Sequence, residues 1–289
     1  MGKKWIFGKN IVISGASGGI GFHIANLLAT KYSCNIIGIG RTQEKLEKAK
    51  NEIDKSINDY FEKQTKKLKN KAIKKGSFDY KLFDVSVLQN WQDFKIKLLE
   101  EKFKVDVLIN NAGIMLPFDK FENQDLELAK KVMETNFYSS LYSYKIFIEE
   151  LKNNKGAIIN ISSSAALCPV VGTAIYSASK AALKNFTEAI REENKKEIYV
   201  SYVCPGYTKT ELFRNEKEIS KLVDKFSSKA DVVAKKIVKR IVKKRRRIVL
   251  GIDAHLMSGL YRLTPKTAPS TVSWVLKASK DKLFEKLFK

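Results

Sequence analysis

Short apolar runs alternate with longer amphipathic stretches along most of the chain. The short runs have the length of buried strands, and the stretches between them have the spacing of helices. This alternation is typical of βα units around a parallel sheet, so we predict a doubly wound α/β fold with helices on both faces. The seven expected strands are Asn10–Ser14, Cys34–Gly40, Phe78–Val85, Val105–Asn110, Gly156–Ser162, Ile198–Cys204 and Arg247–Gly251.

Two regions depart from the regular alternation. The helix after the second expected strand is long, from Gln43 to Lys69, and is expected to project beyond the sheet. Near the C-terminus Pro265 and Pro269 forbid a continuous helix, so two helical segments are expected there. We therefore predict one Rossmann-type catalytic domain over residues 1–252 and a helical extension over residues 253–289.

The 289-residue chain is 44% hydrophobic, which suffices for a full core, and its formal net charge is +23. Such a charge predicts attraction to phosphorylated cofactors, membrane surfaces or nucleic acid. The excess is concentrated near the C-terminus, where residues 230–289 hold 16 Lys and Arg against 4 Asp and Glu. Part of the charge is explained by solvated helix faces.

The cysteines Cys34, Cys168 and Cys204 show neither CxxC spacing nor an even count. We therefore expect reduced thiols in a reducing compartment. No secretory signal and no run of 18 apolar residues is found, so a cytoplasmic protein without a spanning helix is expected. His23 and His255 are too few and too isolated to predict a metal site.

A glycine-rich segment, "SGASGGIG", follows the first expected strand and precedes a helix. Its glycines Gly15, Gly19 and Gly21 allow a tight turn and a close approach to a diphosphate, for which the helix N-terminus offers unpaired N–H groups. A plain tight turn is the alternative interpretation.

Three further strand ends carry residues that could contact a dinucleotide. Arg41 follows Gly40, where NAD-specific sites have an acidic residue, so NADP is favoured over NAD; a solvated arginine is the alternative. Asp84 could accept from an adenine amino group or cap the next helix. Asn111 could fix loop backbone or touch the cofactor, and Gly113 would let the cofactor approach, although a plain turn explains both.

The stretch "IYSASKAALKNF" places Tyr176 and Lys180 four residues apart, on one face of an expected helix. A free tyrosine has a pKa near 10, and a neighbouring ammonium group together with an oxidised nicotinamide would lower the pKa of the phenol. We therefore predict that Tyr176 is an acid/base group. An isolated pair of this kind is more often an ordinary amphipathic helix pair.

Five ordered motifs resemble those of the short-chain dehydrogenase/reductase family: "SGASGGIG", "NNAG", "NISSS", "YSASK" and "CPGYTKT". The resemblance covers Asn10 to Thr210, and the later strand "RIVLG" extends it. It implies a Rossmann-type fold, a nicotinamide cofactor, carbonyl/alcohol interconversion and a homodimer or homotetramer. The corresponding helix of the family, here "SASKAA", often lies in a dimer interface.

The resemblance also implies a catalytic tetrad. Its members correspond to Asn136, Ser163, Tyr176 and Lys180, with Ser162 and Ser164 as neighbours that could replace Ser163. In the family the serine holds the carbonyl oxygen, the lysine also grips the nicotinamide ribose, and the asparagine supports a proton relay. The expected cofactor contacts are Gly15, Ser17, Gly19, Ile20, Gly21, Arg41, Asp84, Val85, Asn111, Ala112, Gly113, Tyr176, Lys180, Pro205, Gly206, Thr208 and Thr210.

Three positions depart from the family pattern. Ser14 replaces a threonine and keeps the hydroxyl, and Thr208 replaces a commonly apolar residue, so a backbone contact is expected there. Ser139 replaces a frequent glycine, and we expect this change to alter helix packing more than chemistry.

Apolar segments are expected around the substrate, which predicts a lipophilic ketone or alcohol. Core packing explains several of these residues equally well, and Cys168 is interpreted as a small apolar filler. The segments are Ile114–Phe118, Ala166–Thr173 and Thr210–Glu218, with Met115, Leu116, Leu167, Val170, Val171, Leu212 and Phe213 as wall residues and Arg214 as the one candidate for a substrate charge.

The basic C-terminal helix admits three interpretations: contact with a membrane surface, packing on its own domain or a partner subunit, and nucleic-acid binding. Its apolar residues Trp274, Val275, Leu276, Leu283, Phe284, Leu287 and Phe288 can gather on one side. Our leading hypothesis for the whole chain is an NADP-dependent oxidoreductase. A nucleotide-sensing or scaffold protein without turnover is the alternative, and nucleic-acid binding is supported only by the net charge.

Overall fold

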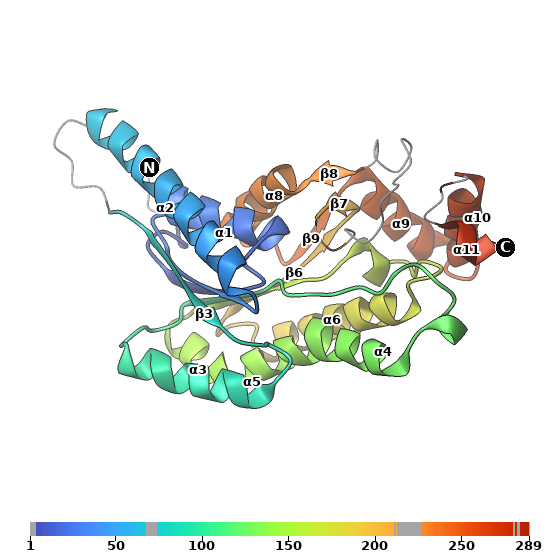
Figure 1. Cartoon of the computed structure of the whole chain (residues 1–289), viewed down its shortest axis with the longest axis horizontal. Helices are drawn as coiled ribbons and strands as arrows, with labels where there is room; N and C mark the ends of the chain where they lie inside the picture. The colour runs from blue at the N-terminus through green and yellow to red at the C-terminus, as the bar shows by residue number, and fades with distance from the viewer. Residues whose placement is uncertain are drawn as a thin grey trace.

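A parallel sheet of seven strands forms the centre of the protein (Figure 1). The computed structural model describes residues 4–67, 74–210, 212, 227–279, 281 and 284–288. The strand order β3-β2-β1-β4-β5-β6-β9 is that of a doubly wound Rossmann-type sheet, as the alternation predicts. The strands are β1 (Asn10–Ser14), β2 (Asn35–Gly40), β3 (Ser77–Leu82), β4 (Val107–Asn110), β5 (Ala157–Ile161), β6 (Tyr199–Pro205) and β9 (Arg247–Leu250).

Helices cover both faces of the sheet because its central strands are apolar on both sides. In β1, Ile11 and Ile13 pack into one hydrophobic cluster, and Val12 between them packs into the other. Helices α1, α2 and α8 lie on the first face, and α3, α5 and α6 on the second (Figure 1). The bounds are α1 (Gly19–Tyr32), α2 (Gln43–Lys67), α3 (Leu88–Glu100), α4 (Leu126–Met133), α5 (Ser139–Asn153), α6 (Ala174–Glu193) and α8 (Ala230–Val242).

All seven expected strands are present, and their ends differ by a few residues. The largest difference is in β3, which ends at Leu82 and not at Val85. The chain turns there because the Asp84 carboxylate accepts hydrogen bonds from the Ser86 N–H and hydroxyl. The long second helix is confirmed to Lys67, and residues 68–69 lie outside the described part. A short parallel pair, β7 (Thr208–Lys209) with β8 (Ser228–Lys229), was not predicted.

Buried polar side chains join the centre of the sheet to the helices below it. The Asn110 amide donates to Asn160 Oδ1 at 2.9 Å, and the Asn160 amide donates to Thr187 Oγ1 on α6 at 2.8 Å. The Ser143 hydroxyl of α5 donates to Asn110 Oδ1 at 3.0 Å. A satisfied buried network is rigid because every alternative leaves a polar group unpaired. It therefore holds α6 in a defined position against β4 and β5.

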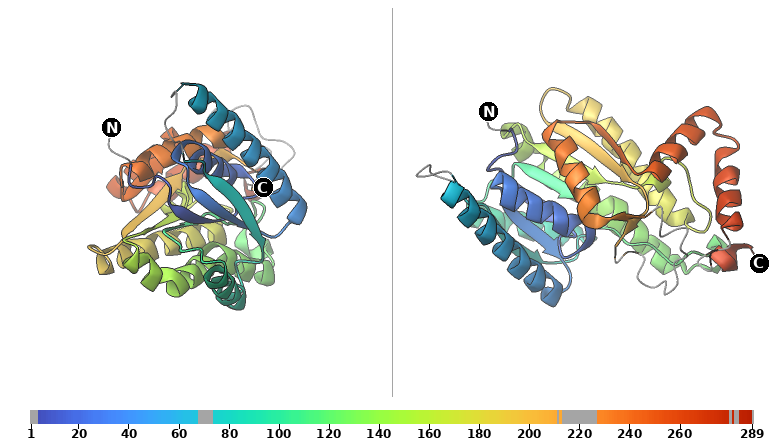
Figure 2. Two further views of the ribbon diagram at one scale, coloured as in Figure 1. Left: turned by 90° about the vertical axis from the view of Figure 1, so that its left-hand side faces the viewer. Right: turned by 90° about the horizontal axis from the view of Figure 1, so that it is seen from above.

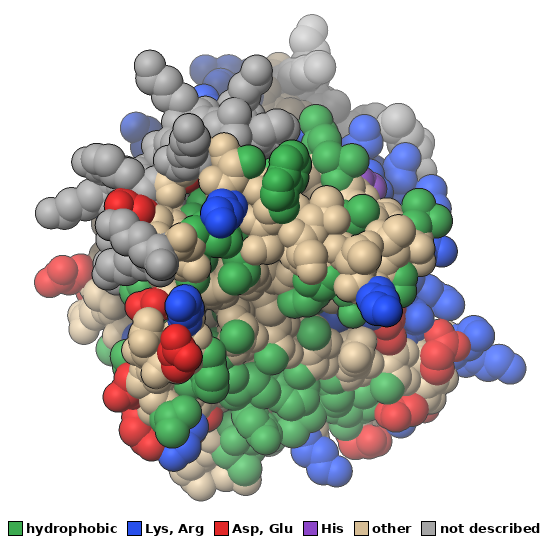
Figure 3. Space-filling view, turned by 90° about the vertical axis from the view of Figure 1, so that its right-hand side faces the viewer, with side chains coloured by type: hydrophobic (Ala, Val, Ile, Leu, Met, Phe, Trp, Pro, Cys, Tyr) green, Lys and Arg blue, Asp and Glu red, His purple; other side chains and the backbone are tan. Residues whose placement is uncertain are grey.

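The C-terminal extension forms one end of the molecule, beyond the carboxyl ends of the strands (Figure 2). It consists of α9 (Ile252–Leu263), α10 (Ala268–Ala278) and α11 (Glu285–Phe288), and hydrophobic side chains are prominent on this end (Figure 3). The predicted break is confirmed: α9 ends at Leu263, before Pro265, whereas Pro269 lies in the first turn of α10, where a proline is tolerated. The expectation of one continuous last helix is wrong, because α10 ends at Ala278, where the Ser279 hydroxyl turns back to the Leu276 carbonyl.

Within the described residues, no helix is both long and apolar enough to cross a bilayer.

Candidate active site

A cavity of about 950 Å³ opens at the carboxyl ends of the central strands. Its lining comes from the loops after β1, β2, β3, β4, β5 and β6, from α6, and from the C-terminal helices α9 and α10. The strand order reverses between β1 and β4, so the loops that follow these two strands run in opposite directions. They leave a crevice at this edge of the sheet. The cavity therefore brings most of the predicted site residues together.

The glycine loop forms one end of this cavity. Gly15 and Gly19 have positive φ angles of 67° and 55°, which favour glycine. A side chain at Gly21 would overlap the Gly15 carbonyl oxygen, so α1 can approach β1 this closely only without one. The N-cap residue of α1, Gly18, has no side-chain hydrogen bond to the first turn. Backbone N–H groups at this helix end suit the oxygens of a diphosphate.

The serine and asparagine beside the loop hold it in shape. The Ser14 hydroxyl accepts from the backbone N–H groups of Asn111 at 3.0 Å and Ala112 at 3.1 Å. The Asn111 amide donates to the carbonyls of Ser14 and Gly15 at 3.2 and 3.0 Å. Of the two roles considered for Asn111, the side chain performs the structural one. The hydroxyl kept at Ser14 explains why this departure from the family pattern is tolerated.

Arg41 and Asp84 lie together at the edge of the same cavity. The Arg41 guanidinium is 3.6 Å from the Asp84 carboxylate. Burial alone would raise the pKa of Asp84, but the hydrogen bonds from Ser86 and the charge of Arg41 outweigh burial and lower it. Thr42 and Lys45 line the cavity beside Arg41 and were missed from the sequence, although Lys45 stands four residues after it. Two cations here suit a phosphate group.

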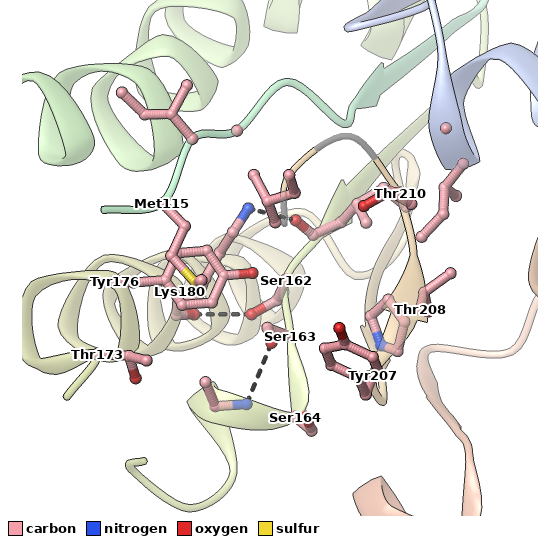
Figure 4. A pocket seen from close by; sticks show the side chains of 18 of the residues that line it. Met115, Ser162, Ser163, Ser164, Thr173, Tyr176, Lys180, Tyr207, Thr208 and Thr210 are labelled. Atoms are coloured by element: carbon pink, nitrogen blue, oxygen red, sulfur yellow. Dashed lines mark hydrogen bonds between the residues drawn. The ribbon is translucent and has the colours of Figure 1, made fainter. Parts of the chain in front are cut away.

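Tyr176 and Lys180 lie on the buried face of α6, as their spacing predicts (Figure 4). The Lys180 ammonium is 5.9 Å from the centre of the Tyr176 ring and donates to the Ile161 carbonyl at 3.0 Å. Burial lowers the pKa of Lys180 to about 8. Burial also raises the pKa of Tyr176, and a hydrogen bond from Ser163 offsets only part of this. In the protein without cofactor, desolvation is thus the dominant influence on the pKa of the phenol. The predicted lowering of this pKa by the lysine together with an oxidised nicotinamide concerns the cofactor-bound protein and stays a prediction.

The three neighbouring serines have different surroundings. The Ser162 hydroxyl donates to the Lys180 carbonyl at 2.8 Å and so ties β5 to α6. Ser163 lies beside Tyr176 at the cavity, and its oxygen accepts from the Ala165 N–H at 3.2 Å (Figure 4). Ser164 begins a short 3₁₀ turn. The geometry thus favours Ser163 as the serine that faces a substrate near Tyr176.

Asn136 sits in a π-helical turn, Glu134–Tyr138, between α4 and α5. Its Oδ1 accepts from the Ile114 N–H at 2.8 Å, and its amide donates to the Ile114 carbonyl and the Ser179 hydroxyl. These bonds fix the segment after β4, and Thr135 lines the cavity in place of Asn136. The hydrogen bonds therefore give no support for a water held by the Asn136 side chain. Ser139 bonds the Thr135 carbonyl at 2.6 Å, a packing role as expected.

Comparisons with known proteins agree with this geometry. Residues 9–221 match the family described as short chain dehydrogenase. The chain belongs to the short-chain dehydrogenase family. It is 32% identical over 265 residues to a bovine 3-ketodihydrosphingosine reductase, covering 88% of this chain and 74% of that protein. It is 31% identical over 211 residues to 11-beta-hydroxysteroid dehydrogenase-like 2 of Arabidopsis thaliana, covering 72% of this chain and 61% of that protein.

Solved structures of dehydrogenases share the fold. A short chain dehydrogenase from Burkholderia cenocepacia in complex with NADP superposes with a TM-score of 0.71 at 22% identity, covering 92% of this chain and 98% of that one. An alcohol dehydrogenase from Thermococcus sibiricus complexed with 5-hydroxy-NADP superposes with a TM-score of 0.69 at 24% identity, covering 84% and 94%. The fold predicted from the motif series is thus confirmed.

The end of β6 and the segment that follows it also line the cavity, and they include the motif residues Pro205 and Gly206. Thr208 lines the cavity, but its hydroxyl bonds the Gly206 carbonyl at 2.9 Å. The Asp253 carboxylate accepts from the Tyr207 N–H at 2.7 Å, and burial raises the pKa of Asp253. A side chain at Gly206 would overlap this carboxylate. The sequence did not predict a role for Asp253, because its sequence neighbours give no sign that it bonds the loop after β6.

The other end of the cavity is apolar. Of the expected wall residues, Met115, Val170 and Leu212 line it. Leu167 instead packs into a separate buried cluster, and Leu116 and Val171 are absent from the lining. Phe213 and Arg214 lie outside the described residues. The sequence missed the contribution of the C-terminal helices, which supply Leu256, Met257, Leu260, Val272, Val275 and Leu276, with Phe284 beyond them.

Proposed function

We propose that this short-chain dehydrogenase interconverts an apolar ketone and its alcohol with NADP(H). One observation carries the proposal: Ser163, Tyr176 and Lys180 line a single cavity that has a glycine loop at one end and an apolar wall at the other. A protein that only senses a nucleotide needs the glycine loop but has no use for the three polar groups together. No observation favours that alternative or nucleic-acid binding.

The residues at the glycine end fit a dinucleotide. The first turn of α1 offers its N–H groups to a diphosphate, and Gly113 leaves room beside Asn136 and Lys180, where an added Cβ would lie 3.2 Å from each. Arg41 and Lys45 suit a 2′-phosphate, which supports NADP over NAD. Structural neighbours are described as complexes with NADP or NADPH, in agreement. When bound, the nicotinamide supplies or accepts the hydride.

The chain's own residues would handle the proton. Burial raises the pKa of Tyr176, so its phenol is protonated at neutral pH and can donate a proton to the carbonyl oxygen during reduction. The Ser163 hydroxyl would donate a hydrogen bond to the same oxygen and hold it next to the phenol. Lys180 has a pKa of about 8, so its ammonium group can supply a proton that restores the Tyr176 phenol.

The apolar end indicates the substrate class. Its lining from the β4 and β5 loops and from α9 and α10 offers hydrophobic contact over a long surface, which suits a lipophilic chain or ring system. The names of two relatives refer to a ketodihydrosphingosine and a hydroxysteroid, which are lipids of this kind. We therefore propose a lipid ketone, or the corresponding alcohol, as the substrate.

The test is a panel of long-chain and steroid ketones, with NADPH or NADH, followed by the absorbance of the reduced nicotinamide. Tyr176→Phe is expected to lower kcat roughly 10²–10⁴-fold, because the general acid is lost. It should leave NADPH binding in place. Tyr138→Phe, at a tyrosine 41% exposed, is the matched control and should behave like the parent.

Three results would contradict the proposal. A Tyr176→Phe variant as fast as the parent would remove the assigned acid. Faster turnover with NADH would remove the argument from Arg41. Tight NADPH binding without turnover of any ketone in the panel would favour the scaffold alternative.

A further inference from the structure

A second cavity, of about 360 Å³, lies where α8, β9 and α9 meet. It is lined by Arg240, Arg247, Arg262 and His255, with the buried Ser258 and Val249 and with Gly259, and none of these lining residues is acidic. The Arg247 guanidinium donates to the Ser258 hydroxyl at 2.7 Å, which fixes its position. Among the described residues, no carboxylate lies within 4 Å of any of these three arginines, although Glu188 and Asp253 are nearby in the fold and bonded to other groups.

Such a cluster is electrostatically unfavourable by itself. Three guanidinium groups around one hollow repel one another, and an anion placed between them relieves this repulsion. Guanidinium groups match phosphate oxygens in geometry as well as in charge. The chemistry of this second cavity therefore suits a phosphate group.

The neighbouring side of α9 is apolar and exposed. Ile252, Leu256 and Leu263 are 71, 67 and 84% exposed. Positions four and seven residues apart share one side of a helix, so these three side chains form a ridge, which we call the α9 ridge. His255 and Arg262 are also seven residues apart and lie on the adjacent side, toward the second cavity. On α10, Trp274 and Val275 are 69 and 50% exposed.

The α9 ridge borders the proposed substrate cavity. Leu256 and Val275 are exposed to solvent and also line that cavity, so exposed apolar side chains reach its rim. On the next side of the same helix, Met257 and Leu260 line the cavity together with Leu256. A lipid substrate could pass over this rim without crossing water.

We propose that α9 docks the protein on an anionic phospholipid bilayer, with the α9 ridge in the acyl boundary and a headgroup phosphate in the arginine cavity. Apolar residues beside clustered cations are the features that hold a helix in a bilayer interface, and anionic lipid strengthens the contact. The α9 ridge alone would fit any apolar partner, but the cations next to it require an anionic one. The proposal concerns binding and therefore stands or falls separately from turnover.

The test is co-sedimentation of the full chain with vesicles of phosphatidylcholine, with and without phosphatidylserine. Binding is expected to require phosphatidylserine. Arg262→Gln should weaken it about five-fold, the effect of one cation near an anionic surface. Ile252→Ser and Leu263→Ser should each weaken it roughly ten-fold, by removing a side chain that enters the apolar layer.

The matched controls lie on α3, away from this end of the molecule. Lys97→Gln removes the same charge as Arg262→Gln, and Leu99→Ser removes an apolar side chain that is 65% exposed. Both should bind vesicles as the parent does. All the variants should keep the parent's circular dichroism spectrum and its turnover of a water-soluble ketone, since none lies in the proposed active site.

Four results would overturn the proposal. The first is that the protein binds neither vesicle, and the second is that the α3 control variants lose as much vesicle binding as the α9 variants. The third is that the arginine cavity binds inorganic phosphate while the protein does not bind vesicles, and the fourth is that the protein binds duplex DNA, which Arg262→Gln weakens, but not vesicles. The last two would assign the arginine cavity to a free anion or to nucleic acid.

Discussion

At the scale of single residues, Lys180 has a proposed role in catalysis, but its buried charge destabilises the folded protein. Its side chain is 4% exposed, and within the described part of the chain its ammonium group donates to a single acceptor, the Ile161 carbonyl. Burial favours the neutral amine and lowers the pKa from 10.5 to about 8. Below pH 8 the folded protein therefore carries a desolvated charge that destabilises it by roughly 3 kcal/mol.

Lys180→Met is consequently expected to raise the melting temperature at pH 7 while abolishing turnover. Between about pH 8 and 10.5 the unfolded chain binds the proton more tightly than the folded one, so the parent gains stability with rising pH relative to the variant. The difference in unfolding free energy should therefore shrink across this window. Urea unfolding of both proteins at several pH values measures it.

Lys131→Met, at an exposed lysine, is the control and should leave the melting temperature almost unchanged. A Lys180→Met variant that is less stable than the parent at pH 7 would show that the ammonium is well solvated in the fold.

At the scale of elements, a small aromatic cluster fastens the last of the C-terminal helices to the rest of the domain. Phe118, in the loop after β4, meets Phe284 edge to face at 5.1 Å between ring centres, and Leu287 completes this small cluster. Gly172 has a φ of 78°, and an added side chain there would overlap Leu287. This fastening explains why the last apolar residues pack on their own domain, one of the interpretations that the sequence left open.

Phe284→Ala is expected to loosen the last C-terminal helices more than it unfolds the protein. Truncating a buried phenylalanine removes about 3–5 kcal/mol of packing, but small terminal elements open locally and bear such losses themselves. We predict a higher KM for apolar ketones with a smaller change in kcat, and faster amide exchange in α10 and α11. Hydrogen exchange and steady-state kinetics measure the two effects.

Phe121→Ala, at a phenylalanine 45% exposed, provides the comparison and should change neither quantity. Unchanged exchange in α10 and α11 of the Phe284→Ala variant would contradict the fastening.

At the scale of the whole molecule, the net charge of +23 opposes compaction. Raising the ionic strength from about 0.01 to 0.15 M shortens the Debye length from about 30 to 8 Å and weakens repulsion between distant lysines. The melting temperature of the protein without ligand should therefore rise with sodium chloride. Scanning calorimetry measures it, with an uncharged solute of equal osmolality as the control. A melting temperature that falls with salt would show that attractive ion pairs dominate.

Local patterns in the sequence predicted the strands of the sheet and part of the candidate site. The alternation of apolar and amphipathic runs predicted all seven strands, because each buried strand is defined by its own residues. The spacing of Tyr176 and Lys180 predicted that they share a face, since a helix has a fixed period. The glycines of the first loop were recognisable because only a residue without a side chain tolerates positive φ and close packing there.

The tertiary structure decided what depends on contacts between distant segments. The direction of the Tyr176 pKa reflects burial, which no spacing reveals. The partners of Asn136 and Asp253 lie 22 and 46 residues away, and the apolar wall of the cavity comes from helices that follow the last strand. Each of these arises because folding brings together groups whose sequence neighbourhoods carry no mark of one another.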